Sequence, residues 1–148
     1  MIDIPPDVQI RATLREGSVY RYHEETHGGP KAHYFVVLNP APDEDSDLVL
    51  VHATSETDKA IARTKDHPDT LVLVTPAEYP EFYRQLSAFD CNTAYVKSVG
   101  QLIAKLQQGE LTLHMQMPLP VVQSLRAGVL ASPVVDSQAQ ALLMPRTE

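Results

Sequence analysis

The chain has 148 residues, with 12 Lys and Arg against 19 Asp and Glu, which gives a formal net charge of −7. A chain of this length can bury roughly two thirds of the surface of its unfolded state, so we expect one domain that needs neither a disulfide nor a structural metal to fold. The single cysteine, Cys91, excludes an internal disulfide, and the acidic charge excludes a protein that coats nucleic acid through clustered Lys and Arg. No secretory leader pattern or run of roughly 18 apolar residues is present, so we expect a cytoplasmic protein without membrane contact.

Five short runs rich in Val, Leu, Tyr or Phe and bounded by turn-forming residues predict β-strands. They cover residues 17–22, 33–38, 48–53, 70–74 and 92–96. The second run is the most continuously apolar and is expected in the centre of the sheet. The acidic, proline-containing segment 40–47 between the second and third runs is predicted to be a solvated connection.

Helices are predicted mainly after the strands. Ser98 and Gln101 have the spacing of a capping box, and Gly109 supplies a stop, so the segment between them predicts a helix. A turn with a short helix over 81–86 is expected after Pro80. Two further helices are predicted in the C-terminal third, over 121–127 with Gly128 as its stop, and from 132 to 143.

This order, with strands first and helices last, favours a mainly β or α+β fold over a doubly wound sheet. Five short strands within about 80 residues suit a small, partly open barrel with helices toward the C-terminus. We expect a single domain over 1–148. The barrel and its capping helix would cover 15–112, and a helical extension would cover 113–148.

The histidines give little support for a metal site. His23 and His27 are four residues apart, a spacing that places two imidazoles on one face of a helix. A strand precedes them and Gly-Gly-Pro follows, which favours a solvated loop. The glycine-rich motifs that bind nucleotide cofactors are absent, so we expect neither a metal nor a cofactor.

A more informative group of residues lies at the ends of two neighbouring strands. The segment from Gly28 and Gly29 through Lys31 to His33 leads into the second strand, and Thr54 and Ser55 follow the third. If the two strands pair in antiparallel fashion, a cationic group faces two hydroxyls, an arrangement that suits an anion such as phosphate. The alternative is that these are an ordinary surface lysine and ordinary strand-end hydroxyls.

Several of these segments together resemble the PemK/MazF-type toxins. The resemblance covers roughly residues 15–112 and is carried by the Gly-Gly-Pro-Lys loop, the strand 34–39, the strand ending at His52-Ala-Thr-Ser55, and the segment 89–98 that opens a helix. It implies an SH3-like barrel, related to the PemK, MazF and CcdB type. It also implies a cytoplasmic endoribonuclease that forms a homodimer and is inhibited by a cognate antitoxin.

The resemblance also implies roles for particular residues. A hydroxyl after the third strand, Thr54 or Ser55, and a basic residue after the glycine loop would cleave RNA without metal through attack of the 2′-hydroxyl on phosphorus. Members of the family usually carry Arg before this strand, where this chain has Lys31 and His33. Substrate binding is expected from Gly28, Gly29 and Arg21.

The leading hypothesis is therefore a toxin-like, metal-independent endoribonuclease acting on single-stranded RNA. The alternative is a non-catalytic barrel module that binds a protein partner through its groove or its C-terminal helices. A third possibility is a small-molecule enzyme in which His33 and His52 act together. The nuclease hypothesis requires the acidic run 43–47 to point away from a cleft surrounded by Arg11, Arg15, Arg21 and Lys31.

Overall fold

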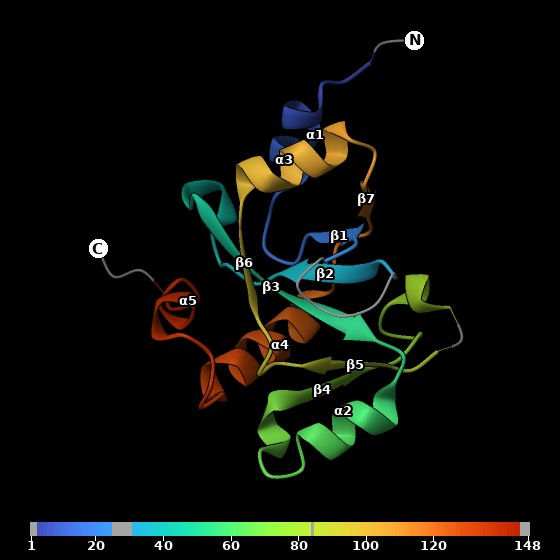
Figure 1. The fold of residues 1–148 in the computed structure, drawn as a ribbon, viewed down its shortest axis with the longest axis vertical. Helices are drawn as coiled ribbons and strands as arrows, with labels where there is room; N and C mark the ends of the chain where they lie inside the picture. Colours follow the sequence, from blue (N-terminus) through green and yellow to red (C-terminus); the bar gives the residue numbers. More distant parts are fainter. Residues whose placement is uncertain (1–2, 25–30, 84, 146–148) are drawn as a thin grey trace.

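The computed structural model describes residues 3–24, 31–83 and 85–145 (Figure 1). This part of the chain is an α+β structure with one seven-stranded antiparallel sheet, five α-helices and three short 3₁₀ helices. The strands are β1 (Val19–Tyr22), β2 (His33–Val37), β3 (Asp47–Thr54), β4 (Leu71–Val74), β5 (Ser87–Asp90), β6 (Tyr95–Ser98) and β7 (Leu111–His114). The α-helices are α1 (Pro6–Thr13), α2 (Thr57–Arg63), α3 (Val99–Gln107), α4 (Leu119–Ala131) and α5 (Ser137–Ala141), and the 3₁₀ helices are Pro42–Glu44, Pro68–Thr70 and Pro80–Phe82.

The sheet runs in the order β4-β5-β3-β2-β1-β7, and β6 pairs with β3 off this path. The long strand β3 is central because one edge pairs with β2 while the other is shared by β6 and β5. The predicted α+β class is confirmed. The ladders of the described residues do not close into a barrel, and there are seven strands where about five were expected. The prediction missed β5 and β7, because both are four-residue strands that depend on distant partners.

Helices α1 and α3 pack together on one face of the sheet (Figure 1). The core on this side joins Ile10 and Leu102 from the two helices to sheet residues such as Tyr22, Phe35 and Leu50. The capping box of α3 is present as predicted. The Gln101 backbone amide donates to Ser98 Oγ at 3.1 Å, and the Ser98 backbone amide donates to Gln101 Oε1 at 2.8 Å. Helix α1 was not predicted, because its start at Pro5-Pro6 offers no polar side-chain cap.

Helix α4 packs on the opposite face and is a substantial part of the second core. Val122, Leu125 and Val129 are fully buried there, and Met117 at the entrance to the helix is also buried. Gly128 does not end the helix as predicted. The helix continues to Ala131, and an added Cβ at Gly128 would meet the Cys91 sulfur at 2.8 Å, so the absence of a side chain allows close packing. The segment after residue 113 therefore contributes to the hydrophobic core.

Two other helix predictions are corrected. The helix expected over 81–86 is a 3₁₀ turn, Pro80–Phe82, after which the chain turns at Tyr83 and enters β5. The last helix is shorter than expected and begins after Asp136, whose side chain accepts from the Gln138 amide at 2.8 Å. Ala139 in this helix and Leu143 just after it are buried in the core.

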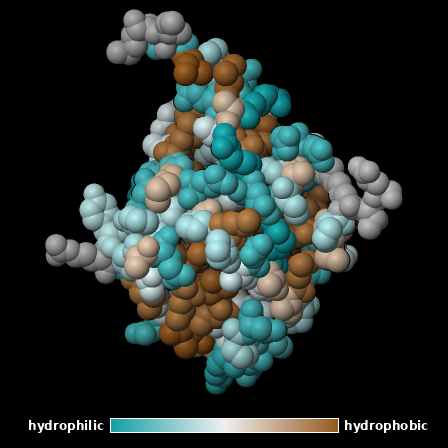
Figure 2. All heavy atoms as spheres, turned by 180° about the vertical axis from the view of Figure 1, so that it is seen from behind, coloured by the Kyte–Doolittle hydropathy of each residue, from teal (hydrophilic) through white to brown (hydrophobic). Residues whose placement is uncertain are grey.

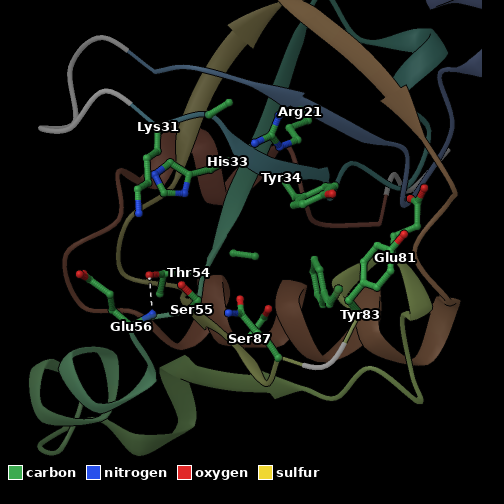
Figure 3. Close-up of a pocket in the computed structure, with 14 residues that line it drawn as sticks. Arg21, Lys31, His33, Tyr34, Thr54, Ser55, Glu56, Glu81, Tyr83 and Ser87 are labelled. Atoms are coloured by element: carbon green, nitrogen blue, oxygen red, sulfur yellow. Dashed lines mark hydrogen bonds between the residues drawn. The ribbon is translucent and has the colours of Figure 1, made fainter.

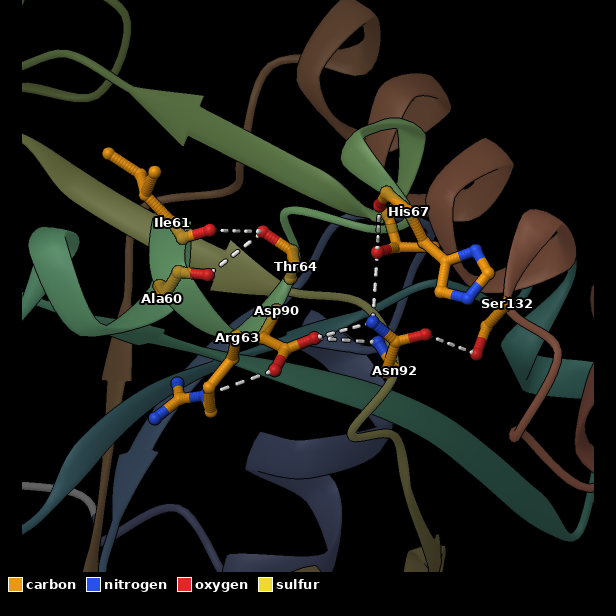
Figure 4. Close-up of polar contacts among 9 residues, drawn as sticks. Ala60, Ile61, Arg63, Thr64, His67, Asp90, Asn92 and Ser132 are labelled. Atoms are coloured by element: carbon orange, nitrogen blue, oxygen red, sulfur yellow. Dashed lines mark hydrogen bonds and ion pairs between the residues drawn. The ribbon is translucent and has the colours of Figure 1, made fainter.

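A polar network ties α2, β5 and the end of α4 together (Figure 4). Asn92 is its centre, because its side-chain amide donates to Thr70 Oγ1 at 2.8 Å and its carbonyl oxygen accepts from Ser132 Oγ at 2.6 Å. Asp90 accepts from both amide groups of Asn92 and pairs with Arg63 at 3.3 Å. Partly buried polar groups of this kind need such partners to avoid a desolvation cost. The network fixes the C-terminal helices against the β4-β5 half of the sheet.

None of the helices in the described ranges combines the length and apolar character required to cross a membrane.

Candidate functional site

The sheet divides where β2 begins and β3 ends. Strands β2 and β3 pair from Phe35–His52 to Val37–Leu50. The first two residues of β2 keep only their β1 partners on the other side, and the last two residues of β3 pair with β5. The two strands separate at this point because each follows a different neighbour.

An open cleft of about 780 Å³ lies at this division (Figure 3). One wall comes from β1, β2 and the residues before β2, and the facing wall comes from the end of β3. The end away from Lys31 and Thr54, called the far end below, is formed by residues 81–83, 85 and 87, which extend from the 3₁₀ turn to the start of β5. The lining residues are Arg21, Lys31, Ala32, His33, Tyr34, Ala53, Thr54, Ser55, Glu56, Glu81, Phe82, Tyr83, Gln85 and Ser87.

The cleft brings together the predicted site residues that lie in the described ranges. Lys31 and His33 lie on one wall, Thr54 and Ser55 lie on the other, and Arg21 lies on the same wall as His33 (Figure 3). The predicted glycines of segment 28–29 lie outside the described residues. The expectation that Arg11 and Arg15 surround the cleft is wrong. The lining contains neither residue, because Arg11 is on α1 and Arg15 borders a smaller hollow beside β7.

The turn after β3 orients the Thr54 hydroxyl. Thr54 Oγ1 accepts a hydrogen bond from the Glu56 amide at 3.1 Å, a side-chain-to-backbone turn that leads into α2. A hydroxyl that accepts one bond can still donate its own proton to a ligand oxygen. Glu56 itself is exposed and pairs with Lys59 at 3.3 Å, which partly offsets its negative charge at the rim.

His33 has a second histidine beside it. The rings of His33 and His52 have centroids 4.9 Å apart, and His52 also contacts Phe35 and Tyr95 at 5.5 and 5.6 Å. His33 lines the cleft, whereas His52 lies behind it among these aromatic rings. The proposed juxtaposition of the two histidines is therefore present, with one of them at the cleft surface.

Arg21 and Tyr34 extend the cationic wall toward the far end. They are direct partners in the β1–β2 ladder, and the Arg21 guanidinium carbon lies 5.7 Å from the Tyr34 ring centroid. This is a cation–π distance, in which the ring face attracts the positive charge. The stacking holds the guanidinium at the cleft wall.

Sequence reasoning missed the far end, where Glu81 is held by three donors. The Tyr79 hydroxyl donates at 2.8 Å, the Met115 amide donates at 2.9 Å, and His114 Nδ1 lies 3.3 Å away. Burial raises the pKa of Glu81, but these bonds outweigh it and lower the pKa below its ordinary value. No local signal places Glu81 beside His114, because 33 residues separate them.

The acidic run 43–47 lies away from the cleft. It connects the end of β2 to the start of β3, whereas the cleft lies at the start of β2 and the end of β3. The eight residues of β3 separate the two places by about 20 Å, given the rise of a strand. This exceeds the Debye length of about 8 Å at physiological salt. The nuclease hypothesis required this acidic run to lie away from the cleft, and it does.

The described residues contain no group of three or more His, Cys, Asp or Glu side chains arranged to hold a metal ion. His27, the second residue of the predicted histidine pair, lies outside the described residues. Cys91 is fully buried, and burial raises its pKa to about 12, so it is a structural thiol and not a nucleophile.

No protein-family model matches this chain, and a search of curated proteins finds no significant match.

Proposed function

We propose that the cleft binds single-stranded RNA and cleaves it as a metal-independent endoribonuclease. The observation that carries the proposal is that Lys31 and His33 face Thr54 and Ser55 across one open cleft. Ammonium and hydroxyl groups on opposite walls can bind the oxygens of one phosphate, and an imidazole can accept or donate a proton at neutral pH.

The reaction uses the RNA's own 2′-hydroxyl. His33 accepts the proton of that hydroxyl while its oxygen attacks the adjacent phosphorus, and the bond from phosphorus to the 5′-oxygen breaks. The 5′-oxygen takes a proton from solvent. Lys31, Thr54 and Ser55 stabilise the charge on the non-bridging oxygens as it develops. The products are a 2′,3′-cyclic phosphate and a 5′-hydroxyl.

Arg21 supplies a guanidinium to a chain that lacks the toxin family's usual arginine before the second strand. The toxins usually place Arg just before the second strand, whereas this chain has Lys31 and His33 there. Arg21 lines the same cleft from the neighbouring strand, so a planar guanidinium is available from a different position. We assign it to substrate binding.

The SH3-like barrel belongs to the same proposal. We infer that β1, β2, β3, β5 and β6 with α3 correspond to the barrel and its helix in the toxin family. The supporting feature is β3, which pairs with β6 along its first half and with β5 at its end, as a strand shared between two sides of a small barrel does. Homodimer formation and a cognate antitoxin are part of this proposal and are tested by light scattering and by co-expression with the neighbouring gene product.

The decisive experiment is cleavage of a defined single-stranded RNA in EDTA at low salt. We expect fragments that end in 2′,3′-cyclic phosphate. His33→Ala should lower the rate by about 10²- to 10⁴-fold, the range for losing a general acid or base, and Thr54→Val and Lys31→Met should also lower it. Arg11→Met is the matched control for Lys31→Met, because it removes one positive charge outside the cleft. Intact RNA with the wild-type protein would reject the enzymatic proposal.

The alternative is a non-catalytic module that binds a protein partner. Two acidic residues in the cleft lining, Glu56 and Glu81, favour it, because they repel phosphate and attract basic side chains. Removing the C-terminal helices would not test partner binding cleanly, because α4 supplies core residues and its loss would unfold the protein. Glu56→Lys separates the two proposals, because it should strengthen RNA binding and weaken binding of a basic partner.

A further inference from the structure

Tyr83 is an exposed aromatic residue at the far end of the cleft. The residue is 84% exposed, the highest value among the large hydrophobic residues in the described ranges. It is also a lining residue of the cleft, at the end opposite Lys31 and Thr54 (Figure 3). A tyrosine that buries almost none of its ring contributes little to folding.

The backbone at Tyr83 adds a second observation. Tyr83 has φ 57° and ψ −112°, and in the described ranges it is the one residue other than glycine with positive φ. The Gln85 amide donates to the Phe82 carbonyl at 3.2 Å, which closes a turn around it. These angles belong to the first central position of a type II′ turn, where glycine dominates. The chain therefore keeps a bulky side chain where the backbone disfavours one, a pattern that points to function.

Buried rings support the turn from below. Phe82 is buried and packs edge to face against Tyr79 at 4.7 Å and against Tyr34 at 5.5 Å. The Tyr79 hydroxyl in turn bonds to Glu81. The residue before Tyr83 is thus packed in the core, which anchors the turn that carries the exposed ring.

The cleft has a polar end and an aromatic end. Lys31, His33 and the two hydroxyls of Thr54 and Ser55 lie at the first, while Tyr34, Phe82 and Tyr83 lie at the second. Its volume of about 780 Å³ exceeds what one phosphate needs and falls in the range of pockets that enclose a whole small ligand. Unpaired RNA has a chemical group for each end. Its bases are free to stack on aromatic side chains, and its phosphates carry the negative charge that the polar end attracts.

We propose that Tyr83 is a stacking platform for an unpaired base of the RNA, at the end of the cleft opposite the phosphate held by Lys31 and Thr54. The proposal rests on the function proposed above and adds a nucleobase subsite to it. Stacking uses the face that all bases share, so this subsite favours single-stranded over paired RNA without selecting one base.

The test is fluorescence anisotropy with a labelled, 2′-O-methylated RNA octamer, which binds but cannot be cleaved. Stacking is worth about 1–3 kcal/mol per base by alanine substitution, so Tyr83→Ala should weaken binding by about 5- to 150-fold. Tyr83→Phe keeps the ring and should stay within about twofold of wild type. Val134→Ala, which trims another highly exposed side chain far along the chain, should have no effect.

Tyr83→Gly separates stacking from folding. Glycine accepts the positive φ, so this variant should melt at a higher temperature than wild type while binding the octamer as weakly as Tyr83→Ala. If wild type binds the octamer and Tyr83→Ala binds it equally well, the stacking platform is rejected and the nuclease proposal stands. If wild type binds no RNA at all, the proposed function itself is rejected.

Discussion

Lys97 Nζ lies 2.8 Å from a carboxylate oxygen of Glu24, and this pair is almost hidden from water, with Glu24 only 4% exposed. Glu24 follows β1 and Lys97 lies in β6, two strands that do not pair with each other. The ion pair therefore links the end of β1 to β6, which are separated by β2 and β3 in the strand order.

Removing one partner of this pair should be costly. Lys97→Met leaves the Glu24 carboxylate buried without its cation, and such losses destabilise proteins by about 3–5 kcal/mol. We expect a loss near the lower limit, because Lys97 is 17% exposed. Glu24→Gln combined with Lys97→Met should be less destabilising than Lys97→Met alone. Urea unfolding measures both, and equal stability of the single variant and wild type would contradict the assignment.

Gly128 and Gly100 should respond in opposite ways to alanine. An added Cβ at Gly128 meets Cys91 Sγ at 2.8 Å, so Gly128→Ala should cost about 1–3 kcal/mol by overpacking. At Gly100 the nearest neighbour is Ser98 Oγ at 3.8 Å, so Gly100→Ala should gain about 0.5 kcal/mol from helix propensity. Adding Cys91→Ala to Gly128→Ala should recover part of the lost stability, because it removes the sulfur that the new Cβ meets. Thermal unfolding of Gly128→Ala, Gly100→Ala and the double variant measures these effects.

The Cys91 thiol should be unreactive in the folded protein. It is fully buried, and burial together with the negative charge of Asp90 raises its pKa to about 12. A thiol with this pKa is scarcely ionised at pH 8, and the thiolate is the reactive form. Ellman's reagent should give no colour with native protein at pH 8 and one equivalent in guanidinium chloride. Rapid reaction of the native protein would show that Cys91 is accessible.

Glu81 should contribute to the pH dependence of stability. Its pKa is lowered below the ordinary value of 4.5 in the folded state, so its contribution is complete above that pH and is lost as the pH falls through the folded pKa. Glu81→Gln removes this effect. Urea unfolding between pH 7 and pH 3 measures the free energy of unfolding of wild type and Glu81→Gln. The difference between the two should shrink below about pH 4.5. A difference that stays constant over this range would contradict the lowered pKa.

The local elements of the fold follow from short stretches of sequence. Continuous apolar runs predicted β2, β3 and β4 close to their observed bounds, because a run of β-branched and aromatic residues between turn formers favours a strand wherever it packs. The Ser98–Gln101 capping box predicted the start of α3 for the same reason, since its bonds join residues three apart. The positions of the basic and hydroxyl residues at strand ends likewise follow from this local pattern.

How those residues meet depends on strand pairing between distant parts of the chain. His33 and Thr54 face each other across a cleft because β3 leaves β2 to pair with β5, a strand that local pattern did not predict. Glu81 and Tyr83 enter the same cleft from a segment expected to be helical, held by Met115 and His114 more than 30 residues away. Pairing over such separations depends on register and core packing, which a local pattern does not encode.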